Sequence, residues 1–209
     1  MIITEQMLND LRAAVAGRMT EKRFAHTYEV EQMIVRLGEM YLPDQIPLLR
    51  AAALLHDLTK ELSFEEQVAI LRAHGKSVTE FDRHAPKTLH ARTAALLIPE
   101  QFPAFADPEL LFCVRFHTTG RAGMSLAAKL LYLADYIDMS RTFSDCVTLR
   151  EFFFGAEPEK MTMAERLDHL RETLILSFDM TMRALIDDGK PLSVDTAHAR
   201  NELICERRK

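Results

Sequence analysis

The chain has 209 residues, 48% hydrophobic and 27% charged, a composition typical of a globular protein with one sizeable core. Its formal net charge of −5 provides no basic surface for nucleic acid, so we expect no nucleic-acid partner. No apolar run approaches the roughly 18–20 residues of a membrane span, and the N-terminus has no signal-peptide pattern, so a cytoplasmic protein without a membrane partner is expected. The 3 cysteines are too widely spaced for a disulfide framework or a C-x-x-C site and agree with a reducing compartment.

Helix-forming residues dominate the sequence, which has only 7 glycines. Apolar residues recur at helical spacing, and no segment alternates as a strand does. The clearest stripes are Val30, Met33, Ile34 and Leu37; Leu126, Leu130, Leu133 and Ile137; and Leu167, Leu170 and Leu174. Breaks between helices are predicted at residues 43–47, 75–77, 99–108, 120–123 and 189–191. We therefore expect an all-α helical bundle in a single domain, 1–209, with a core at about 18–160 and a C-terminal helical extension at 161–209.

The first candidate site residue, His26, stands in the segment RFAHTYEVEQMIVRLG, where it shares an apolar helix face with Val30 and Met33. A histidine on such a face is more often a buried core residue than a metal ligand. The local pattern therefore leaves both interpretations of His26 open.

The segment AAALLHDLTK, residues 51–60, carries His56, Asp57 and Lys60 at the close of an apolar helix. Core helices exclude such groups unless they are paired or bound to a metal. In one interpretation, Asp57 and Lys60 form a surface ion pair and His56 is a satisfied core residue. In the other, His56 and Asp57, which point about 100° apart on a helix, flank a metal ion, and Lys60 steadies a phosphate held on it.

Two further histidines lie at the ends of segments, His90 in KTLHARTAALL and His117 in VRFHTTGRAGMS. The second opens a turn rich in hydroxyl groups and glycine, where Thr118 and exposed backbone N–H groups would suit an anionic ligand. Ser125 is placed to cap the helix that follows. An ordinary helix–helix loop explains the same turn, so this segment alone does not establish a site.

The helix SLAAKLLYLADYID carries Asp135 on the side opposite to its leucine stripe. That side is also apolar and is lined mostly by small residues, namely Ala127, Ala128, Leu131 and Ala134. A carboxylate on a buried face is costly unless a positive group meets it, and small neighbours leave room for such a partner. The pattern therefore favours a functional role for Asp135.

In chain order, His26, His56-Asp57 and Asp135 resemble the H…HD…D pattern of the HD-domain metal-dependent phosphohydrolases. Three longer stretches make the resemblance narrower. AAALLHDLTKELS, FHTTGRAGMSLAAKLLYLADYIDMSR and GKPLSVDTAHARN are similar to the YqeK family, the symmetrical bis(5′-nucleosyl)-tetraphosphatases of bacteria. The similarity extends over nearly the whole chain.

This resemblance implies an HD-domain helical bundle that holds a divalent metal, most often iron, with manganese or zinc as alternatives. It also implies cleavage of diadenosine tetraphosphate into two ADP by metal-activated water. The implied metal ligands are His26, His56, Asp57 and Asp135. The resemblance leaves open whether one ion or two are bound and whether the chain forms a homodimer.

Further roles follow from the same resemblance. Residues that would take part in catalysis are Asp57, Lys60 and His117. Residues that would contact the substrate are Lys60, His90, His117, Thr118, Arg141, Asp195 and Thr196, the last two at its nucleoside end. His90 and His117 would either face the phosphates, where one of them could protonate the leaving group, or hold a second metal. The chain departs from the family pattern at Ser193-Val194 and Asp138-Met139, and neither departure affects an implied ligand.

Two other functions stay open. Another HD-domain enzyme would act on a dNTP, a nucleoside monophosphate, an alarmone or a cyclic dinucleotide, although Leu58-Thr59-Lys60 replaces the HD-GYP signature of the cyclic-dinucleotide enzymes. An inactive nucleotide-binding HD protein would usually lack the His-Asp pair, which this chain retains. Walker-type and G-x-G-x-x-G loops are absent from the sequence, which argues against ATPase and dehydrogenase functions.

Overall fold

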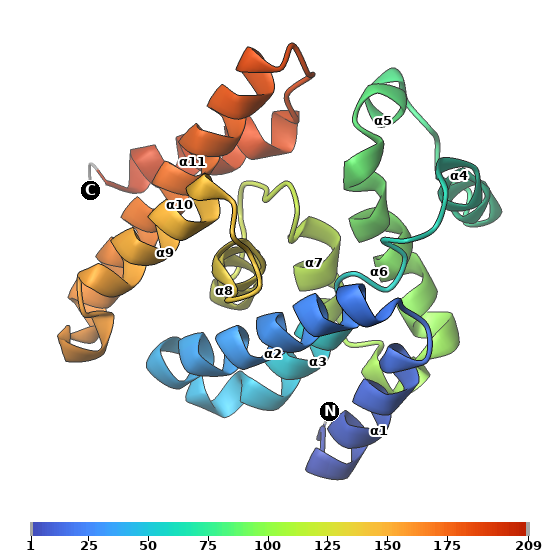
Figure 1. Ribbon diagram of the computed structural model, residues 1–209, viewed down its shortest axis with the longest axis horizontal. Helices are drawn as coiled ribbons and strands as arrows, with labels where there is room; N and C mark the ends of the chain where they lie inside the picture. The colour runs from blue at the N-terminus through green and yellow to red at the C-terminus, as the bar shows by residue number, and fades with distance from the viewer. Residues whose placement is uncertain (1, 208–209) are drawn as a thin grey trace.

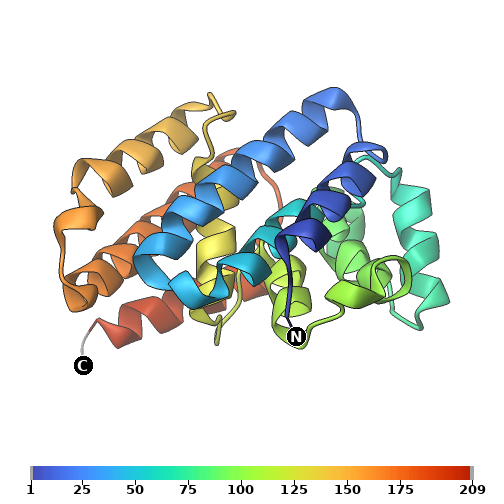
Figure 2. The same cartoon turned by 90° about the horizontal axis from the view of Figure 1, so that it is seen from below.

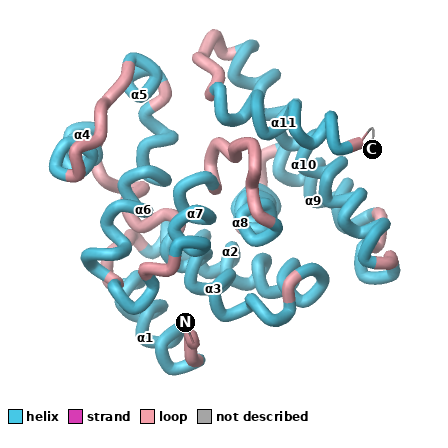
Figure 3. The backbone as a smooth tube through the Cα atoms, turned by 180° about the vertical axis from the view of Figure 1, so that it is seen from behind, coloured by secondary structure: helices cyan, strands magenta, loops and turns pink. Residues whose placement is uncertain are grey.

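The computed structural model describes residues 2–207, which form helices and loops without a strand (Figure 3). The α-helices are α1 Glu5–Ala16, α2 Glu21–Tyr41, α3 Ile46–Leu55, α4 Phe64–Ala73, α5 Glu80–His84, α6 Leu89–Gln101, α7 Pro108–Phe116, α8 Leu126–Ile137, α9 Ser144–Gly155, α10 Met163–Asp187 and α11 Val194–Glu206. Short 3-10 helices are η1 Pro43–Gln45, η2 Pro86–Thr88, η3 Pro103–Phe105 and η4 Pro158–Lys160. The expected all-α fold is confirmed. Within residues 2–207, no helix combines the length and apolarity needed to cross a bilayer.

Helix α8 lies at the centre of the bundle, where Figure 1 shows it end-on. In this view α2 and α3 lie below it, α4–α7 stand to its right, and α9–α11 lie to its left and above. Figure 2 shows the axes of α2, α9 and α10 nearly parallel to one another. Helix α8 contacts α2, α3, α7 and α9, so a polar group on its surface faces other helices rather than solvent.

The composition of α8 explains its central position. Both its leucine stripe and its opposite side are buried, including Leu130, Leu131, Leu133, Ala134 and Ile137. A helix that is apolar nearly all round requires neighbours on every side. The hydroxyl oxygen of Ser125 accepts the N–H of Ala128 at 3.1 Å, so Ser125 caps the helix as its position in the sequence predicts.

The two C-terminal helices pack on the same core as the rest of the chain. Leu174 and Phe178 of α10 and Leu203 of α11 belong to the continuous cluster of buried apolar side chains that contains α8. The turn between these helices, at residues 188–193, lies next to α5 in Figure 1. The C-terminal helices therefore complete the surroundings of the loop that joins α7 to α8.

Several helix boundaries differ from the expectations drawn from sequence, which also miss the breaks after α1, α3, α5, α8 and α9. Helix α6 continues through Pro99 to Gln101, because a proline in the last turn removes one N–H while its fixed φ still suits a helix. The predicted break therefore begins at Phe102. Helix α3 ends at Leu55, so His56-Asp57 lies in the turn that follows the helix and not within it.

Candidate metal centre

Three buried histidines meet from three helix ends. His56 follows the last residue of α3, His90 lies in the first turn of α6, and His117 follows the last residue of α7. Each ring Nδ1 lies 2.6–2.8 Å from the backbone carbonyl oxygen three residues earlier, those of Ala53, Lys87 and Val114. Because a carbonyl only accepts hydrogen bonds, Nδ1 carries the proton, and Nε2 keeps a free electron pair, the state in which imidazole binds a metal.

The three rings form a row with a fourth, His26 of α2. The ring centroids of His26 and His56 are 5.5 Å apart, those of His56 and His117 are 4.9 Å apart, and those of His117 and His90 are 5.0 Å apart. The Nε2 atoms of His90 and His117 approach to 3.0 Å. The row therefore has a His26 end and a His90 end.

The Asp57 carboxylate lies between the two halves of this row. Its Oδ2 is 3.7 Å from Nε2 of His26 and 3.5 Å from Nε2 of His56. Its Oδ1 is 3.1 Å from Nε2 of His90 and 3.8 Å from Nε2 of His117. Each oxygen thus faces one pair of imidazoles, an arrangement that suits a carboxylate shared by two adjacent cation positions.

Asp135 of α8 lies at the His26 end of the row. Its Oδ1 is 3.1 Å from Nε2 of His26 and 3.7 Å from Nε2 of His56. Asp138 follows the helix, and its Oδ2 is 3.3 Å from Nδ1 of His26. Arg141 forms ion pairs with both carboxylates. Asp135 thus meets positive partners, as its place on an apolar helix face requires.

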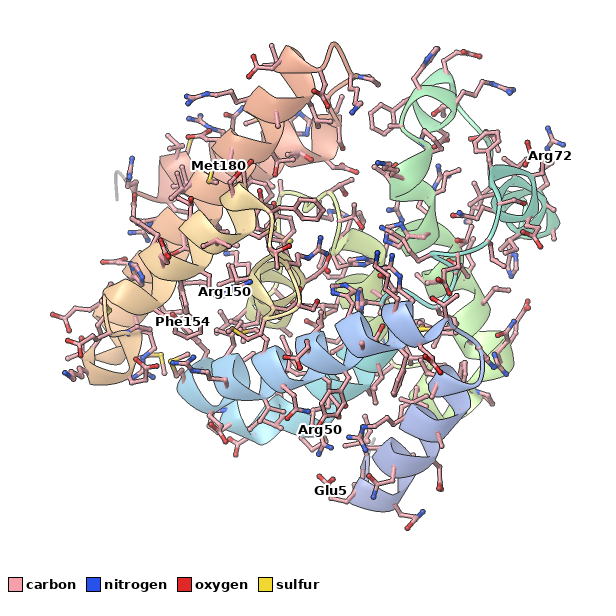
Figure 4. The ribbon with its side chains drawn as sticks, viewed as in Figure 1. Glu5, Arg50, Arg72, Arg150, Phe154 and Met180 are labelled. Carbon is pink, nitrogen blue, oxygen red and sulfur yellow. The ribbon has the colours of Figure 1, made fainter. Side chains whose placement is uncertain are left out.

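The loop that carries Asp138 and Arg141 is held from α9 by Arg150. Figure 4 shows Arg150 directed from α9 towards α8. Its guanidinium donates to the carbonyl oxygens of Ile137 and Arg141, both at 2.8 Å. These bonds fix the backbone after α8 and, with it, the two charged side chains at the His26 end.

Nε2 of His56 is buried and has no hydrogen-bond partner among residues 2–207. Buried polar atoms are nearly always satisfied, so this atom indicates a missing ligand. Potential ligand atoms lie within 4.8 Å of one another in four overlapping groups: His26, His56 and Asp57; His56, His117 and Asp135; Asp57, His90 and His117; and His26, Asp135 and Asp138. Imidazole nitrogens and carboxylate oxygens are donors that iron, manganese and zinc accept. The cluster therefore fits a divalent transition metal.

The protonation states of His56, His117, Asp57 and Asp135 suit metal binding. Burial lowers the pKa of His56 and takes that of His117 well below its ordinary value, so both rings are neutral. Burial alone would raise the pKa of a carboxyl group. Lys60 near Asp57 and Arg141 beside Asp135 outweigh it and hold both pKa values well below the usual range. Neutral imidazoles and ionised carboxylates are the forms that ligate metals.

A cavity of about 500 Å³, here called the first cavity, opens along the cluster, and its lining extends from Asp135 to Lys60 and Thr118 beside His90. Residues with proposed roles that line it are Lys60, His117, Thr118, Asp135 and Arg141. Nζ of Lys60 lies 3.2 Å from Nε2 of His90, and the Thr118 hydroxyl lies 3.0 Å from Nε2 of His117. The cavity therefore joins a candidate metal position to two cationic side chains, a combination that suits a polyphosphate.

The residues predicted to meet the nucleoside lie apart from the first cavity. The Thr196 hydroxyl donates to the carbonyl oxygen of Thr119 at 2.7 Å, which ties α11 to the loop after His117. Asp195 lines a different cavity, which Thr119 also lines. The remaining predicted site residues all lie in or beside the histidine row.

Residues 23–140 match the family model of the HD domain. The matched segment is more than half of the chain and contains His26, His56, Asp57 and Asp135. The chain belongs to the HD-domain family. The resemblance drawn from the sequence is thereby confirmed.

Curated members similar to this HD-domain chain share one description. A symmetrical bis(5′-nucleosyl)-tetraphosphatase of Bacillus subtilis (strain 168) is 31% identical over 192 residues, which are 92% of this chain and 95% of the relative. One of Halalkalibacterium halodurans is 30% identical over 194 residues, 93% of this chain and 95% of the relative. The similarity thus includes the C-terminal helices as well as the matched HD domain.

A solved structure supports the same fold. The crystal structure of a predicted HD superfamily hydrolase involved in NAD metabolism, from Clostridium acetobutylicum, aligns with a TM-score of 0.81 and 31% identity. The alignment covers 95% of this chain and 97% of that one. The arrangement of all the helices, and not only those of the matched HD segment, is therefore shared.

Two residues at this HD-domain centre are not among the site residues predicted from the sequence. Arg23 donates from Nη1 to Oδ2 of Asp57 at 2.7 Å, and the fully buried Asp138 contacts His26. Arg23 lies three residues before His26 and Asp138 three after Asp135, but this spacing alone does not distinguish either residue from an ordinary surface residue.

We expect metal uptake by this HD-domain centre to release a proton from His26. Burial lowers the pKa of His26, but hydrogen-bonded Asp135 and Asp138 outweigh it and raise the pKa to about 9. At pH 7 a metal must therefore displace the proton, and affinity rises with pH up to about pH 9, by at most about tenfold per pH unit from this group.

The measurement is calorimetric titration of Mn²⁺ into chelator-treated protein in buffers of different ionisation enthalpy. The exposed His198 provides the control, since His198→Ala should leave the proton release unchanged. Heats that do not depend on the buffer, together with an affinity that does not depend on pH, would contradict the expectation.

Proposed function

We propose that this HD-domain chain hydrolyses diadenosine tetraphosphate symmetrically to two ADP. The observation that carries the proposal is a buried cluster of imidazoles and carboxylates that borders a cavity with Lys60 and Arg141 on its wall. Two cations beside a metal position suit a chain of phosphates. The curated relatives named as symmetrical bis(5′-nucleosyl)-tetraphosphatases support this substrate and this position of cleavage.

The metal would be held by His26, His56, Asp57 and Asp135, whose candidate ligand atoms lie close together. We propose iron, while the same donors suit manganese and zinc. His90 and His117 with the other oxygen of Asp57 would hold a second ion. A bound divalent metal supplies a water of lowered pKa and offsets charge on the phosphoryl oxygens.

The chain's own residues bind and orient the phosphates in this proposal. Lys60 and Arg141 meet the non-bridging oxygens, and Thr118 donates its hydroxyl hydrogen to one of them. His117 already donates its Nδ1 proton to a backbone carbonyl, and burial takes its pKa well below the ordinary value. These observations favour a ligand role for His117 over proton donation to the leaving group.

Product analysis tests the proposed function. Protein purified without chelator is incubated with diadenosine tetraphosphate, and the nucleotides are separated by anion exchange. ADP as the sole product is expected. ATP together with AMP would contradict symmetric cleavage. Hydrolysis of a dNTP or a nucleoside monophosphate in place of the dinucleotide would favour another HD-domain activity, and a metal-free, inactive protein would favour the nucleotide-binding alternative.

Replacing Lys60 with alanine should reduce turnover and leave metal content unchanged. Its ammonium group is largely buried beside the cluster, where burial lowers its pKa and Asp57 offsets part of that effect. Loss of one such charge from a preorganised site is expected to lower kcat by about 100-fold. Elemental analysis and steady-state kinetics measure both quantities, with the exposed Lys76→Ala as the control. A parallel loss of metal would contradict a role confined to the phosphates.

We also propose that the chain forms one domain, with the C-terminal helices as part of the enzyme. Leu174, Phe178 and Leu203 share the core cluster with α8, which supports this view. The cysteines of the described chain are free, which supports a reducing cytoplasmic location. We further propose a homodimer, which the family resemblance leaves open. Light scattering should then give twice the mass of one chain.

A further inference from the structure

Phe143 stands in solvent at the edge of the first cavity. Its side chain is 72% exposed, and it lines this cavity together with Lys60, Asp135 and Arg141. A single exposed apolar side chain is common on protein surfaces and by itself needs no explanation. Here, however, the ring borders the cavity that contains a carboxylate of the metal cluster and both phosphate-binding cations, so a ligand held by these groups also meets the ring.

The position of Phe143 in the fold is unusual for an aromatic residue. It is the N-cap of α9, where Ser, Thr, Asp and Asn are preferred because their side chains accept a backbone N–H, and it makes no such hydrogen bond. The neighbouring helices α8 and α10 do have capping side chains, those of Ser125 and Thr162. Phe143 thus contributes nothing to capping and, at its exposure, little to the core, which leaves its ring available for a ligand.

The backbone that carries this ring is nevertheless fixed. The carbonyl oxygen of Phe143 accepts the N–H of Val147 at 3.0 Å, in the first turn of α9. Arg141, two residues before Phe143, forms an ion pair with Asp135, and its carbonyl oxygen accepts a hydrogen bond from Arg150 at 2.8 Å. A ring on such a backbone is positioned before the ligand arrives, which lowers the entropic cost of binding.

The spacing between Phe143 and the nearer cation suits a nucleotide. The α-carbons of Arg141 and Phe143, two positions apart, are separated by at most about 7 Å. In a nucleotide one ribose lies between the base and its phosphate, so a phosphate at Arg141 leaves the base within reach of the ring. Ser144 and Asp145 lie on the same wall, where their side-chain oxygens can accept hydrogen bonds from ribose hydroxyl groups.

We propose that Phe143 is the base-stacking residue of the first cavity, with one base of the dinucleotide against its ring and the adjoining phosphates at Arg141 and Lys60. The inference rests on the proposed function, because it takes a nucleotide as the occupant. Asp195, which the family resemblance assigns to the nucleoside end, lines a different cavity, so the contact at Phe143 is separate from it. Every base has a π-face, and stacking does not read its edges, so this contact accepts adenine and guanine alike.

Tryptophan fluorescence tests the proposal without relying on turnover. The chain has no tryptophan, so Phe143→Trp places a single fluorophore at the proposed contact in Zn²⁺-loaded protein. ADP should quench its fluorescence saturably, because the base stacks on the indole, whereas pyrophosphate, which has phosphates and no base, should not. Phe152→Trp is the matched control, because Phe152 is also exposed on α9 but packs against His169 and does not line the first cavity. Neither ligand should quench it.

Substitution at the same position separates stacking from a structural role. Phe143→Ala should raise the Kd for ADP by about tenfold or more and leave the Kd for pyrophosphate unchanged. It should also raise KM for diadenosine tetraphosphate with little change in kcat, because the lost contact is made equally in the ground state and the transition state. Phe143→Tyr, which keeps an aromatic ring, should bind ADP as the wild type does.

Three results would overturn the inference: no quenching by ADP, equal quenching by pyrophosphate, or wild-type ADP affinity in Phe143→Ala. A chain that cuts diadenosine tetraphosphate symmetrically and yet gives one of these results keeps the proposed function and loses only the base contact. Quenching specific to ADP in a chain that does not cut the dinucleotide would instead contradict the proposed function, so the two failures are distinguishable.

Discussion

Replacing Asp57 with alanine is expected to remove the bound metal and to lower kcat/KM for diadenosine tetraphosphate by at least about 1,000-fold. Both carboxylate oxygens of Asp57 face imidazole nitrogens, Oδ2 towards His26 and His56 and Oδ1 towards His90. Asp57 thus lies within 4 Å of imidazole nitrogens in both halves of the row. Its removal therefore takes a ligand away from the metal, whether the centre holds one ion or two.

Elemental analysis and hydrolysis assays on the same preparation measure this effect. Asp168→Ala is the matched control, because Asp168 is exposed on α10 and, among residues 2–207, forms an ion pair only with Arg171. Asp57→Asn keeps the size of the side chain and guards against collapse around Arg23, which loses its partner in the alanine variant. A variant that retains stoichiometric metal and wild-type turnover would exclude Asp57 from the centre.

Much of the candidate site follows from local sequence pattern. His26 and Asp135 can be selected because each is a polar residue on an otherwise apolar helix face, where burial without a partner is costly. The structure brings both to within 3.1 Å of each other, although 109 positions separate them in the sequence, as their numbers show. Periodicity can indicate which faces are buried, but only the family resemblance indicates that these faces meet.

The two residues at the metal centre that sequence reasoning does not identify act on ligands rather than on substrate. Arg23 lies near the start of α2 among other charged residues, and nothing local distinguishes it from a solvated surface arginine. Its role depends on Asp57, which reaches it only after α3 has packed against α2. Asp138 stands where the chain departs from the family pattern, so a comparison of motifs also passes over it. Such contacts arise from packing between helices and have no signature within one segment.

The helix boundaries also fall into two groups, those that follow from local sequence and those that depend on other contacts. Each break predicted from the sequence coincides with a connection between helices, because glycine and proline act through their own backbone preferences, but the connections after α1, α3, α5, α8 and α9 are not predicted. The end of α3 at Leu55 is different, since no glycine or proline follows it. There the Nδ1 of His56 donates to the carbonyl of Ala53, one of the carbonyls that a helix end leaves without a backbone partner. The ligand itself thus helps to end the helix that presents it.

Gly120→Ala is expected to destabilise the protein by about 3 kcal/mol, from a left-handed backbone and a core clash together. Gly120 has a φ of +62°, and a Cβ built on it would lie 2.7 Å from Cζ of Phe178. Phe178 is fully buried in α10, so its ring has little freedom to move away. The loop would have to retreat from the core and would take His117 and Thr118 with it.

Gly123→Ala separates the two contributions within the same loop. Gly123 also has a positive φ, +76°, but a Cβ there meets no atom within 4 Å. Its cost should be about 1 kcal/mol, the backbone contribution alone. Urea unfolding of both variants measures the difference, which we expect to be about 2 kcal/mol and to be accompanied by at least a tenfold loss of hydrolysis in Gly120→Ala only. Equal destabilisation of the two variants would mean that contact with Phe178 does not position the loop, and the placement of His117 would then depend on α7 alone.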